Sequence, residues 1–319
     1  MHVPMHVSPL RAASTLALAL SAATLAAPAQ AAPAELYIDA ATHAMPGMPG
    51  MGAMGRLAGA MGGQRPSYGM TRHPGMPGRY LDVALYNRAA PGQPATQAVP
   101  KGLQLGNSIE LLARERGRDE AAGSHDGSGG LGLADGASYR VRYFWGCGEQ
   151  ARSGQPVEYS MTVRNGKPVQ GGRAMAPRQV PAQGPDIGPQ HVLWPNPGAR
   201  RGVSDTASLV GTHRLEGSGL PASLQFALDR GDDFLPRIEL DSTGSPGEGM
   251  ALEWNPVDGA RGYFIHAMAS QGDTIVMWSS SEDGYAGPEL MDYLPEALLA
   301  QWTGKRTVLG ADARSCRIP

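Results

Sequence analysis

Short stretches of alternating hydrophobic and polar residues recur through the chain beyond its first 78 residues. Residues 138–145 show the pattern most clearly, with aromatic residues on one face, ending at Trp145, and two arginines on the other. A period of two is typical of a half-buried strand. Residues 156–164 predict its hairpin partner, and Asn165-Gly166 is a strong hairpin turn signal. Further strands are predicted over 79–86, 104–113, 208–215, 222–228, 274–279, 306–309 and 315–318. Short strands between Gly- and Pro-containing turns predict a mostly β protein built of antiparallel β-sandwich modules.

Two segments depart from this strand pattern. Residues 290–302 place leucines and Trp302 near helical spacing, with Pro295 at a permissible first turn, and so predict a helix. Residues 171–206 are rich in Pro, Gly and Arg. This segment is too long for an ordinary loop, so we expect it to be loosely ordered.

The N-terminus has the features of a secretory signal peptide. Arg11 precedes a run of small apolar residues over 12–27, and Ala29-Gln30-Ala31 follows as an Ala-x-Ala cleavage site. The apolar run is shorter than the ~20 residues that a membrane span needs. We therefore expect cleavage after Ala31 and export to the periplasm or out of the cell, with no membrane span in the mature chain.

A low-complexity segment of Gly, Met and Pro runs from His43 to Gly78. It offers too few apolar side chains to offset the entropy of ordering a backbone, so residues 32–78 are predicted to form a disordered tether. Methionines recur at every third position, which would align their thioethers on one face of a polyproline II helix. The methionines concerned are Met45, Met48, Met51 and Met54. Thioethers suit Cu(I), which makes these residues and His43 a candidate copper site. A compositionally biased linker without metal is the simpler interpretation.

The segment from residue 236 to 281 carries a distinct pattern of apolar, aromatic and turn residues. The residues that define it are Leu252, Trp254, Pro256, Val257, Gly259, Ala260, Gly262 and Tyr263. The pattern resembles the B-to-C strand region of fibronectin type III domains, whose Trp and Tyr are core residues of two facing sheets. The resemblance implies a fibronectin type III-like module at the C-terminus. That module is expected to be incomplete, because a helix is predicted where the family has strands. Trp254 and Tyr263 are expected to be buried structural residues, and Trp145 is assigned the same role.

Three tryptophan-containing segments extend the resemblance over most of the chain. They read Trp-Gly-Cys-Gly-Glu over 145–149, Trp-Pro-Asn over 194–196 and Trp-Ser-Ser-Ser-Glu over 278–282. The sequence is thereby similar to a family of exported proteobacterial proteins to which no activity is assigned. The resemblance implies architecture and no chemistry. Similar proteins run on beyond the Cys-Arg-Ile-Pro at 316–319, so the chain is expected to be a shortened version.

Composition and charge narrow the class of partner. The 27 basic and 29 acidic residues give a net charge of −2, which gives no support for a nucleic-acid partner. Glycine (44) and proline (27) are frequent among the 319 residues, as in a turn-rich chain without one continuous core. The sequence contains no nucleophile elbow, phosphate-binding loop or zinc-protease motif, so no catalytic or cofactor-binding residue is assigned.

The two cysteines, Cys147 and Cys316, leave two alternatives. An oxidising compartment allows the pair to form a disulfide. A disulfide needs Cα atoms within about 7 Å of each other, whereas these cysteines fall in modules predicted to be separate. The predicted separation slightly favours free thiols.

We therefore expect four segments: a signal peptide over 1–31, a tether over 32–78, a β-rich domain with long loops over 79–232 and the fibronectin-like module over 233–319. This organisation favours a non-catalytic protein of the cell envelope that binds, or gives structure to, an envelope protein or glycan. The first alternative is a periplasmic copper- or metal-handling protein that uses the Met-rich segment. The second alternative is a hydrolase whose site is assembled from residues distant in the sequence.

Overall fold

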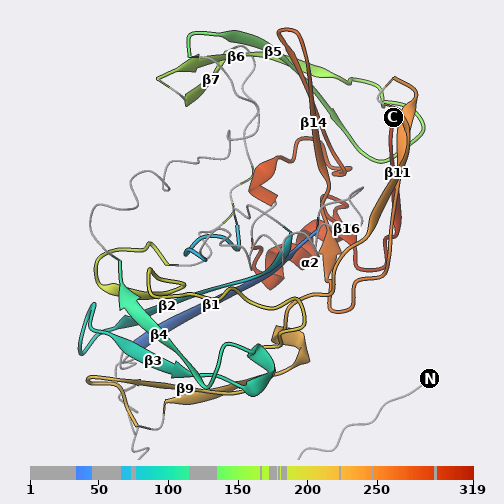
Figure 1. Cartoon of the computed structure of the whole chain (residues 1–319). Helices are drawn as coiled ribbons and strands as arrows, with labels where there is room; N and C mark the ends of the chain where they lie inside the picture. Colours follow the sequence, from blue (N-terminus) through green and yellow to red (C-terminus); the bar gives the residue numbers. More distant parts are fainter. Residues whose placement is uncertain are drawn as a thin grey trace, which may run out of the picture. The chain divides into compact units, whose positions relative to one another are not determined.

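The computed structural model shows a mostly β fold with antiparallel sheets (Figure 1). The described residues are 34–44, 66–72, 77–114, 135–165, 167–171, 178, 180, 185–222, 224–245, 247–290 and 293–319. The predicted signal peptide lies outside them. Among these residues, no helix has the length and apolar character required to cross a bilayer.

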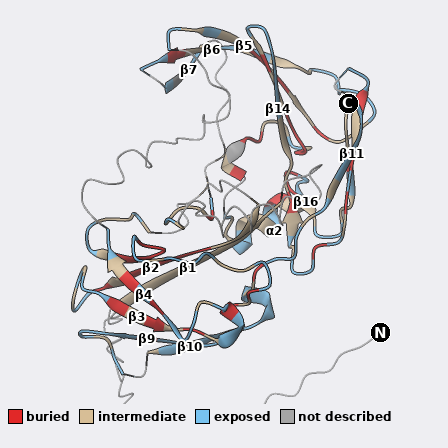
Figure 2. Cartoon of the chain, viewed as in Figure 1, coloured by how far each residue is buried: buried red, intermediate tan, exposed pale blue. Residues whose placement is uncertain are grey.

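A seven-stranded sheet contains the first strands of the chain and the largest apolar core. Its strands, in spatial order, are β1 (Ala34–His43), β2 (Gly78–Asn87), β8 (His191–Trp194), β4 (Ser108–Ala113), β3 (Ala95–Ala98), β9 (Gly211–Gly217) and β10 (Gln225–Leu228). Leu81, Val83 and Leu85 alternate along β2 and are buried in this core, as the sequence pattern predicts. Figure 2 shows the buried positions along β2, β3 and β4. The 3-10 helix η1 (Lys101–Leu103) lies between β3 and β4, and the 3-10 helix η2 (Arg230–Asp232) follows β10.

Strand β1 lies within residues 32–78, which the sequence predicts to be a disordered tether. For Ala34–His43 this prediction is wrong, because these residues form a paired strand. All ten of its residues pair with β2, ending with His43 opposite Gly78. Leu36 and Ile38 pack against the core, a period-two signal that lies before the low-complexity residues begin. Because His43 and Gly78 are directly opposite, the Gly/Met/Pro-rich segment connects two paired strands. A tether would instead lie between the predicted signal peptide and the first strand of the folded domain.

Strand β8 falls in the segment 171–206, which was expected to be loosely ordered. It lies between β2 and β4, and Val192, Leu193 and Trp194 are buried. A strand covered on both faces is apolar at successive positions and therefore shows no alternation. Three such residues after His191 give no recognisable strand signal.

A five-stranded sheet combines strands from the middle and the end of the chain. Its strands, in spatial order, are β14 (His266–Gln271), β15 (Thr274–Ser279), β5 (Ser138–Trp145), β6 (Val157–Arg164) and β7 (Lys167–Gly171). The predicted β5–β6 pairing and the β6–β7 turn at Asn165 are confirmed. However, β5 also pairs with β15, and this pair is parallel. The strands therefore group differently from the predicted boundary between residues 232 and 233, because strands from both sides of it share one sheet.

The remaining strands form two small sheets around an aromatic core. The three-stranded sheet contains β11 (Leu240–Ser245), β12 (Gly249–Trp254) and β17 (Ser315–Ile318), and the two-stranded sheet contains β13 (Gly262–Tyr263) and β16 (Leu309–Gly310). Trp254 is 6% exposed and Tyr263 is 9% exposed, and their ring centroids are 5.4 Å apart. Their predicted burial is confirmed. The predicted helix is α2 (Glu296–Gly304), which follows Pro295 and the 3-10 helix η3 (Pro288–Leu290).

Two of the three tryptophan segments meet where β5 and β15 end. The backbone N–H of Gly146 donates to the carbonyl of Ser279 over 2.9 Å, and Trp278 Nε1 donates to the carbonyl of Gly146 over 3.1 Å. The parallel pairing of β5 with β15 places these segments side by side, although Gly146 and Trp278 are 132 residues apart in sequence. The contact links the middle of the chain to its last third.

Cys147 and Cys316 form a disulfide with Cα atoms 5.2 Å apart, so the preference for free thiols is wrong. That preference assumed two separate modules. The structure instead brings the neighbouring backbone together, with the N–H of Gly148 donating to the carbonyl of Arg317 over 2.9 Å. The bridge joins the loop after β5 to β17 and encloses a sequence separation of 169 residues.

Candidate functional site

The candidate site lies where β8 diverges from β4 in the seven-stranded sheet. These two strands pair only at Leu112–Leu193 and Ala113–Val192. Beyond that point the Asn196 side chain replaces the missing backbone ladder. Its Nδ2 donates to the carbonyls of Glu110 over 2.7 Å and Leu193 over 2.9 Å.

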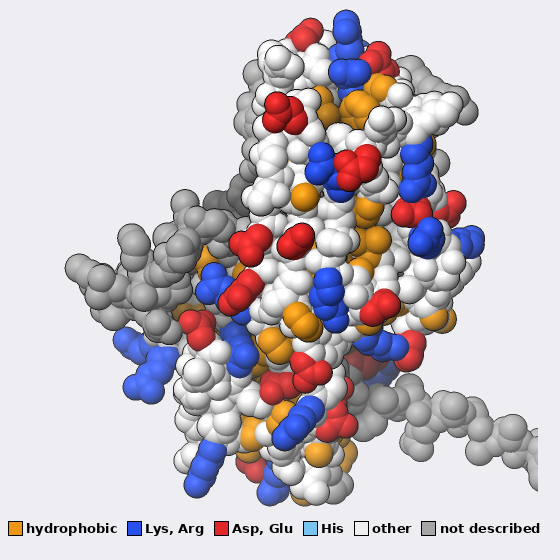
Figure 3. Space-filling model, turned by 90° about the vertical axis from the view of Figure 1, so that its right-hand side faces the viewer, with side chains coloured by type: hydrophobic (Ala, Val, Ile, Leu, Met, Phe, Trp, Pro, Cys, Tyr) orange, Lys and Arg blue, Asp and Glu red, His pale blue; other side chains and the backbone are white. Residues whose placement is uncertain are grey.

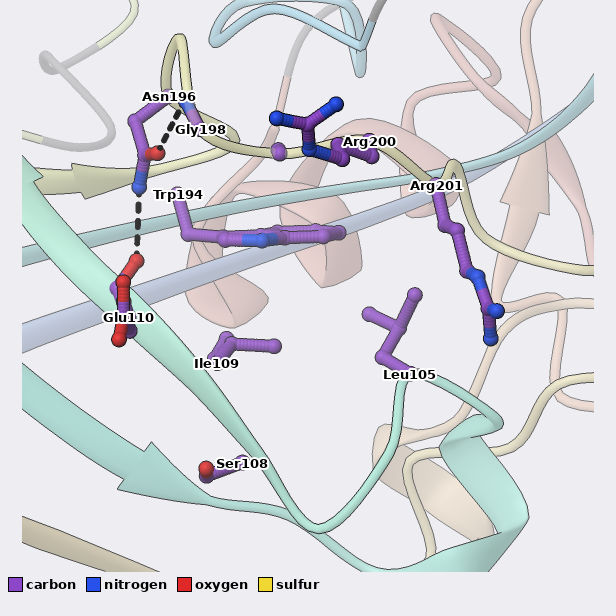
Figure 4. Close-up of a pocket in the computed structure, with 10 residues that line it drawn as sticks. Leu105, Ser108, Ile109, Glu110, Trp194, Asn196, Gly198, Arg200 and Arg201 are labelled. Carbon is purple, nitrogen blue, oxygen red and sulfur yellow. Dashed lines mark hydrogen bonds between the residues drawn. The ribbon is translucent and has the colours of Figure 1, made fainter.

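A pocket of about 310 Å³ opens in this divergence. It is lined by Leu105, Ser108, Ile109, Glu110, Trp194, Asn196, Gly198, Ala199, Arg200 and Arg201. Arg200 lies on one side of the indole of Trp194, and Leu105 and Ile109 lie on the other (Figure 4). The indole is only 5% exposed, so it is fixed by the core and supplies a rigid apolar wall. Asn196 Oδ1 accepts from the N–H of Gly198 over 3.0 Å and so holds the turn that carries the arginines. We call this the Trp194 pocket.

Charged groups line the rim of the Trp194 pocket. Arg200 and Arg201 are exposed, and neither has an acidic partner among the described residues. Glu110 lies toward the opposite end of the indole from Arg201 (Figure 4). A guanidinium presents a planar fork of donors that matches a carboxylate. The pocket therefore combines an apolar wall with two unpaired cationic groups suited to a carboxylate.

The charge elsewhere on the surface is mixed. Figure 3 shows Lys and Arg side chains interspersed with Asp and Glu over the face in view. Exposed charges also pair with each other, for example Arg142 with Glu158 over 3.1 Å. The face in view therefore carries no large field of one sign.

His43, the one predicted metal-site residue that the structure describes, does not line this pocket. Met45, Met48, Met51 and Met54 lie outside the described residues. His43 ends β1, and its Nε2 lies 2.7 Å from the carbonyl of Thr71. Burial lowers the pKa of His43, against the opposing effect of this hydrogen bond. The neutral ring then donates from Nε2 and keeps the lone pair of Nδ1. The copper site stays a prediction, and no cluster of three or more metal-ligating side chains occurs among the described residues.

The residues assigned a structural role have different environments. Trp254 and Tyr263 are in the aromatic core. Trp145 is half-buried and stacks on Tyr143, with ring centroids 5.8 Å apart. Sequence reasoning missed the pocket residues Arg200 and Arg201 because their segment was expected to be loosely ordered. The Trp-Pro-Asn segment was the available signal, since it provides both the wall and the amide that closes the sheet.

A buried carboxylate lies elsewhere in the same sheet. Asp82 is 3% exposed and lies directly opposite Asp39 in the β1–β2 ladder. Its Oδ2 accepts from the N–H of Thr71 over 3.1 Å and from Thr71 Oγ1 over 2.5 Å, which fixes residues 66–72 on β2. Its Oδ1 has no partner in the described part of the chain. Burial raises the pKa of Asp82, and the Thr71 hydrogen bonds oppose that shift only in part.

We expect Asp82→Asn to stabilise the protein at neutral pH. A carboxyl whose pKa is raised by folding stabilises the fold below its unfolded pKa, and this contribution is lost as pH rises through the folded value. The amide keeps an oxygen for Thr71 without a buried charge. Urea unfolding should therefore show a higher midpoint than wild type at pH 7, with the difference shrinking toward pH 4. An equal difference at both pH values would contradict this account, and Asp39→Asn, which removes an ion pair with Arg72, serves as the control.

Comparisons with known proteins identify no relative. No family model, curated protein or solved structure matches the chain. The functional argument therefore depends on the geometry and charge of the pocket itself.

Proposed function

We propose that the protein is an exported, non-catalytic binding protein of the cell envelope. We further propose that the Trp194 pocket takes a carboxylate-bearing component of that envelope. The observation that carries the proposal is that two unpaired guanidiniums line a pocket with a rigid indole wall, Arg200 on one side of the ring and Arg201 beyond its end. Pockets that combine an apolar lining with a few convergent polar groups are typical of ligand sites.

Two features support the proposed compartment. The N-terminal sequence has the order of a signal peptide: a basic residue, an apolar run and an Ala-x-Ala site. The Cys147–Cys316 bridge also fits an oxidising environment, because such bonds are rare in reducing compartments. We also keep the fibronectin type III-like module as a proposal, supported by the packing of Trp254 against Tyr263.

Binding would use each part of the pocket differently. The guanidiniums would donate paired N–H groups to the ligand carboxylate, and such charge-assisted bonds are the stronger class of hydrogen bond. The apolar wall formed by Trp194, Ile109 and Leu105 would contact the carbon skeleton next to that carboxylate. Because the wall belongs to the core and the turn is held by Asn196, little ordering is needed on binding, which favours affinity.

We expect replacement of Arg200 and Arg201 by alanine to weaken carboxylate binding by about tenfold or more, since a hydrogen bond to a charged group contributes ~1.5–3 kcal/mol. Calorimetric titration would use two carboxylated probes, an oligogalacturonate and a peptide with a free C-terminal carboxylate. Neutral oligogalactose and the amidated peptide are the matched uncharged ligands. The two carboxylated probes distinguish a glycan from a protein source of the carboxylate.

The control variant is the double substitution Arg140→Ala and Arg164→Ala, which removes the same charge from exposed positions of the five-stranded sheet. It should bind like wild type. Equal loss in both double variants would indicate a general charge effect and overturn the pocket assignment. Absence of binding to either carboxylated probe by the wild type would overturn the proposed ligand class.

A further inference from the structure

At the end of the β1–β2 ladder that begins β1, the face turned away from the apolar core is acidic and aromatic. Residues of β1 alternate between the core and this face, so Glu35 and Tyr37 share the face that Leu36 does not. Glu35 is directly opposite Tyr86 of β2, and Tyr86 is directly opposite His191 of β8. A carboxylate, a phenol ring and an imidazole therefore form one row across three strands.

A second pocket, of about 330 Å³, opens over this row. It is lined by Glu35, Tyr37, Tyr86, Pro185, Asp186, Gln190 and His191. Tyr37 is the diagonal neighbour of Tyr86 in the ladder, a spacing within reach of aromatic side chains. The lining contains two carboxylates and two phenol rings, and no Lys or Arg.

Arg88 places a cation against two residues that line this pocket, Glu35 and Tyr86. Its guanidinium lies 2.7 Å from Glu35 Oε1, and its central carbon is 5.8 Å from the centroid of the Tyr86 ring. A cation over an aromatic face and beside a carboxylate is held by both the ring quadrupole and the charge. Arg88 and Glu35 are substantially exposed, so a competing cation in solution can displace this contact.

The second carboxylate of the pocket, that of Asp186, gives the pocket a negative charge that Arg88 does not pair with. Asp186 is exposed and has no partner among the described residues. The pocket is also separate from the Trp194 pocket. His191 and Trp194 are three residues apart on β8, and an odd spacing places side chains on opposite faces of a strand.

We propose that this second pocket binds an alkylammonium group, with Arg88 as an internal competitor. The aromatic rings of Tyr37 and Tyr86 contact the ammonium and its methylenes, and Glu35 and Asp186 supply the opposite charge. Such a group occurs in free polyamines and in the lysine side chains of proteins, which share one recognition chemistry. The inference is independent of the carboxylate proposed for the Trp194 pocket.

The test measures cation binding by the full mature protein at low ionic strength, where exposed charges are least screened. The probes are putrescine and N-acetyl-lysine amide, which represent the free amine and the protein-borne source. Two-dimensional NMR titration gives the dissociation constants. We expect Glu35→Gln and Asp186→Asn each to weaken binding by about threefold to tenfold, and Arg88→Ala to tighten it by about twofold to fivefold.

A matched control exists in the five-stranded sheet. Arg142 lies 3.1 Å from Glu158 and its central carbon is 5.6 Å from the ring centroid of Phe144, so this arginine also has a glutamate and an aromatic ring as partners. Arg142→Ala should leave the dissociation constants unchanged. Opposite effects of Arg88→Ala and Glu35→Gln, with Arg142→Ala unchanged, would establish the pocket. Tightening by Arg142→Ala equal to that by Arg88→Ala, unchanged binding in Glu35→Gln, or no binding of either probe by Arg88→Ala would overturn it.

Discussion

Breaking the Cys147–Cys316 bridge is expected to lower the free energy of unfolding by up to about 5 kcal/mol. The bridge closes a loop with a sequence separation of 169 residues, and the chain-entropy relation gives this upper value for so long a loop. It also fixes the loop after β5 to β17, the two elements whose backbones meet at Gly148 and Arg317. Denaturant unfolding of the Cys147→Ser, Cys316→Ser double variant would measure the loss.

The reduced wild-type protein is the natural control for that variant. It retains both sulfur atoms and lacks only the bond, so its unfolding midpoint should match that of the double variant. A non-reducing peptide map of exported protein should contain a linked Cys147–Cys316 peptide. Equal midpoints for oxidised and reduced wild type would show that the bridge does not constrain the unfolded chain.

Replacing Trp254 with alanine is expected to cost about 3–5 kcal/mol, the range for large aromatic residues in close-packed cores. Trp254 is 6% exposed and packs on Tyr263 within a cluster that also contains Leu252 and Cys316. Truncation leaves a cavity that strands paired on both sides of β12 cannot readily close. Urea unfolding followed by circular dichroism would measure the change.

Trp254→Phe provides the matched comparison. The indole Nε1 is buried without a hydrogen-bond partner in the described structure, so its removal relieves a desolvation penalty that partly offsets the lost ring. We expect the phenylalanine variant to lose clearly less stability than the alanine variant. A loss below ~1 kcal/mol for Trp254→Ala would indicate that the fibronectin-like pattern does not mark a core here.

The elements that the sequence predicted are those formed by local pattern. Strands β5, β15 and β17 were predicted with the bounds that the structure has. Apolar and polar residues alternate in β5 and β17, and β15 is a short run of apolar residues after the turn that follows β14. A helix was correctly predicted in this region, but α2 begins at Glu296, directly after Pro295, six residues later than the predicted start at residue 290. The burial of Trp254 and Tyr263 likewise follows from alternation about a short turn.

The strand pairings, the disulfide and the pocket depend on contacts between segments distant in sequence, and only the tertiary structure shows them. Nothing in residues 138–145 indicates a parallel partner at 274–279. That pairing joins the two predicted modules in one sheet, and Cys147, just after β5, forms a disulfide with Cys316. β8 could not be recognised locally, because its three buried residues, Val192 to Trp194, are apolar in succession and show no alternation. Its divergence from β4 creates the Trp194 pocket. Composition fixed the low-complexity character of the segment from His43 to Gly78, whereas only the pairing of β1 with β2 showed that it connects two strands. Local periodicity determines which residues extend and which face is apolar, and the choice of neighbouring strand depends on packing between segments that the sequence order does not place together.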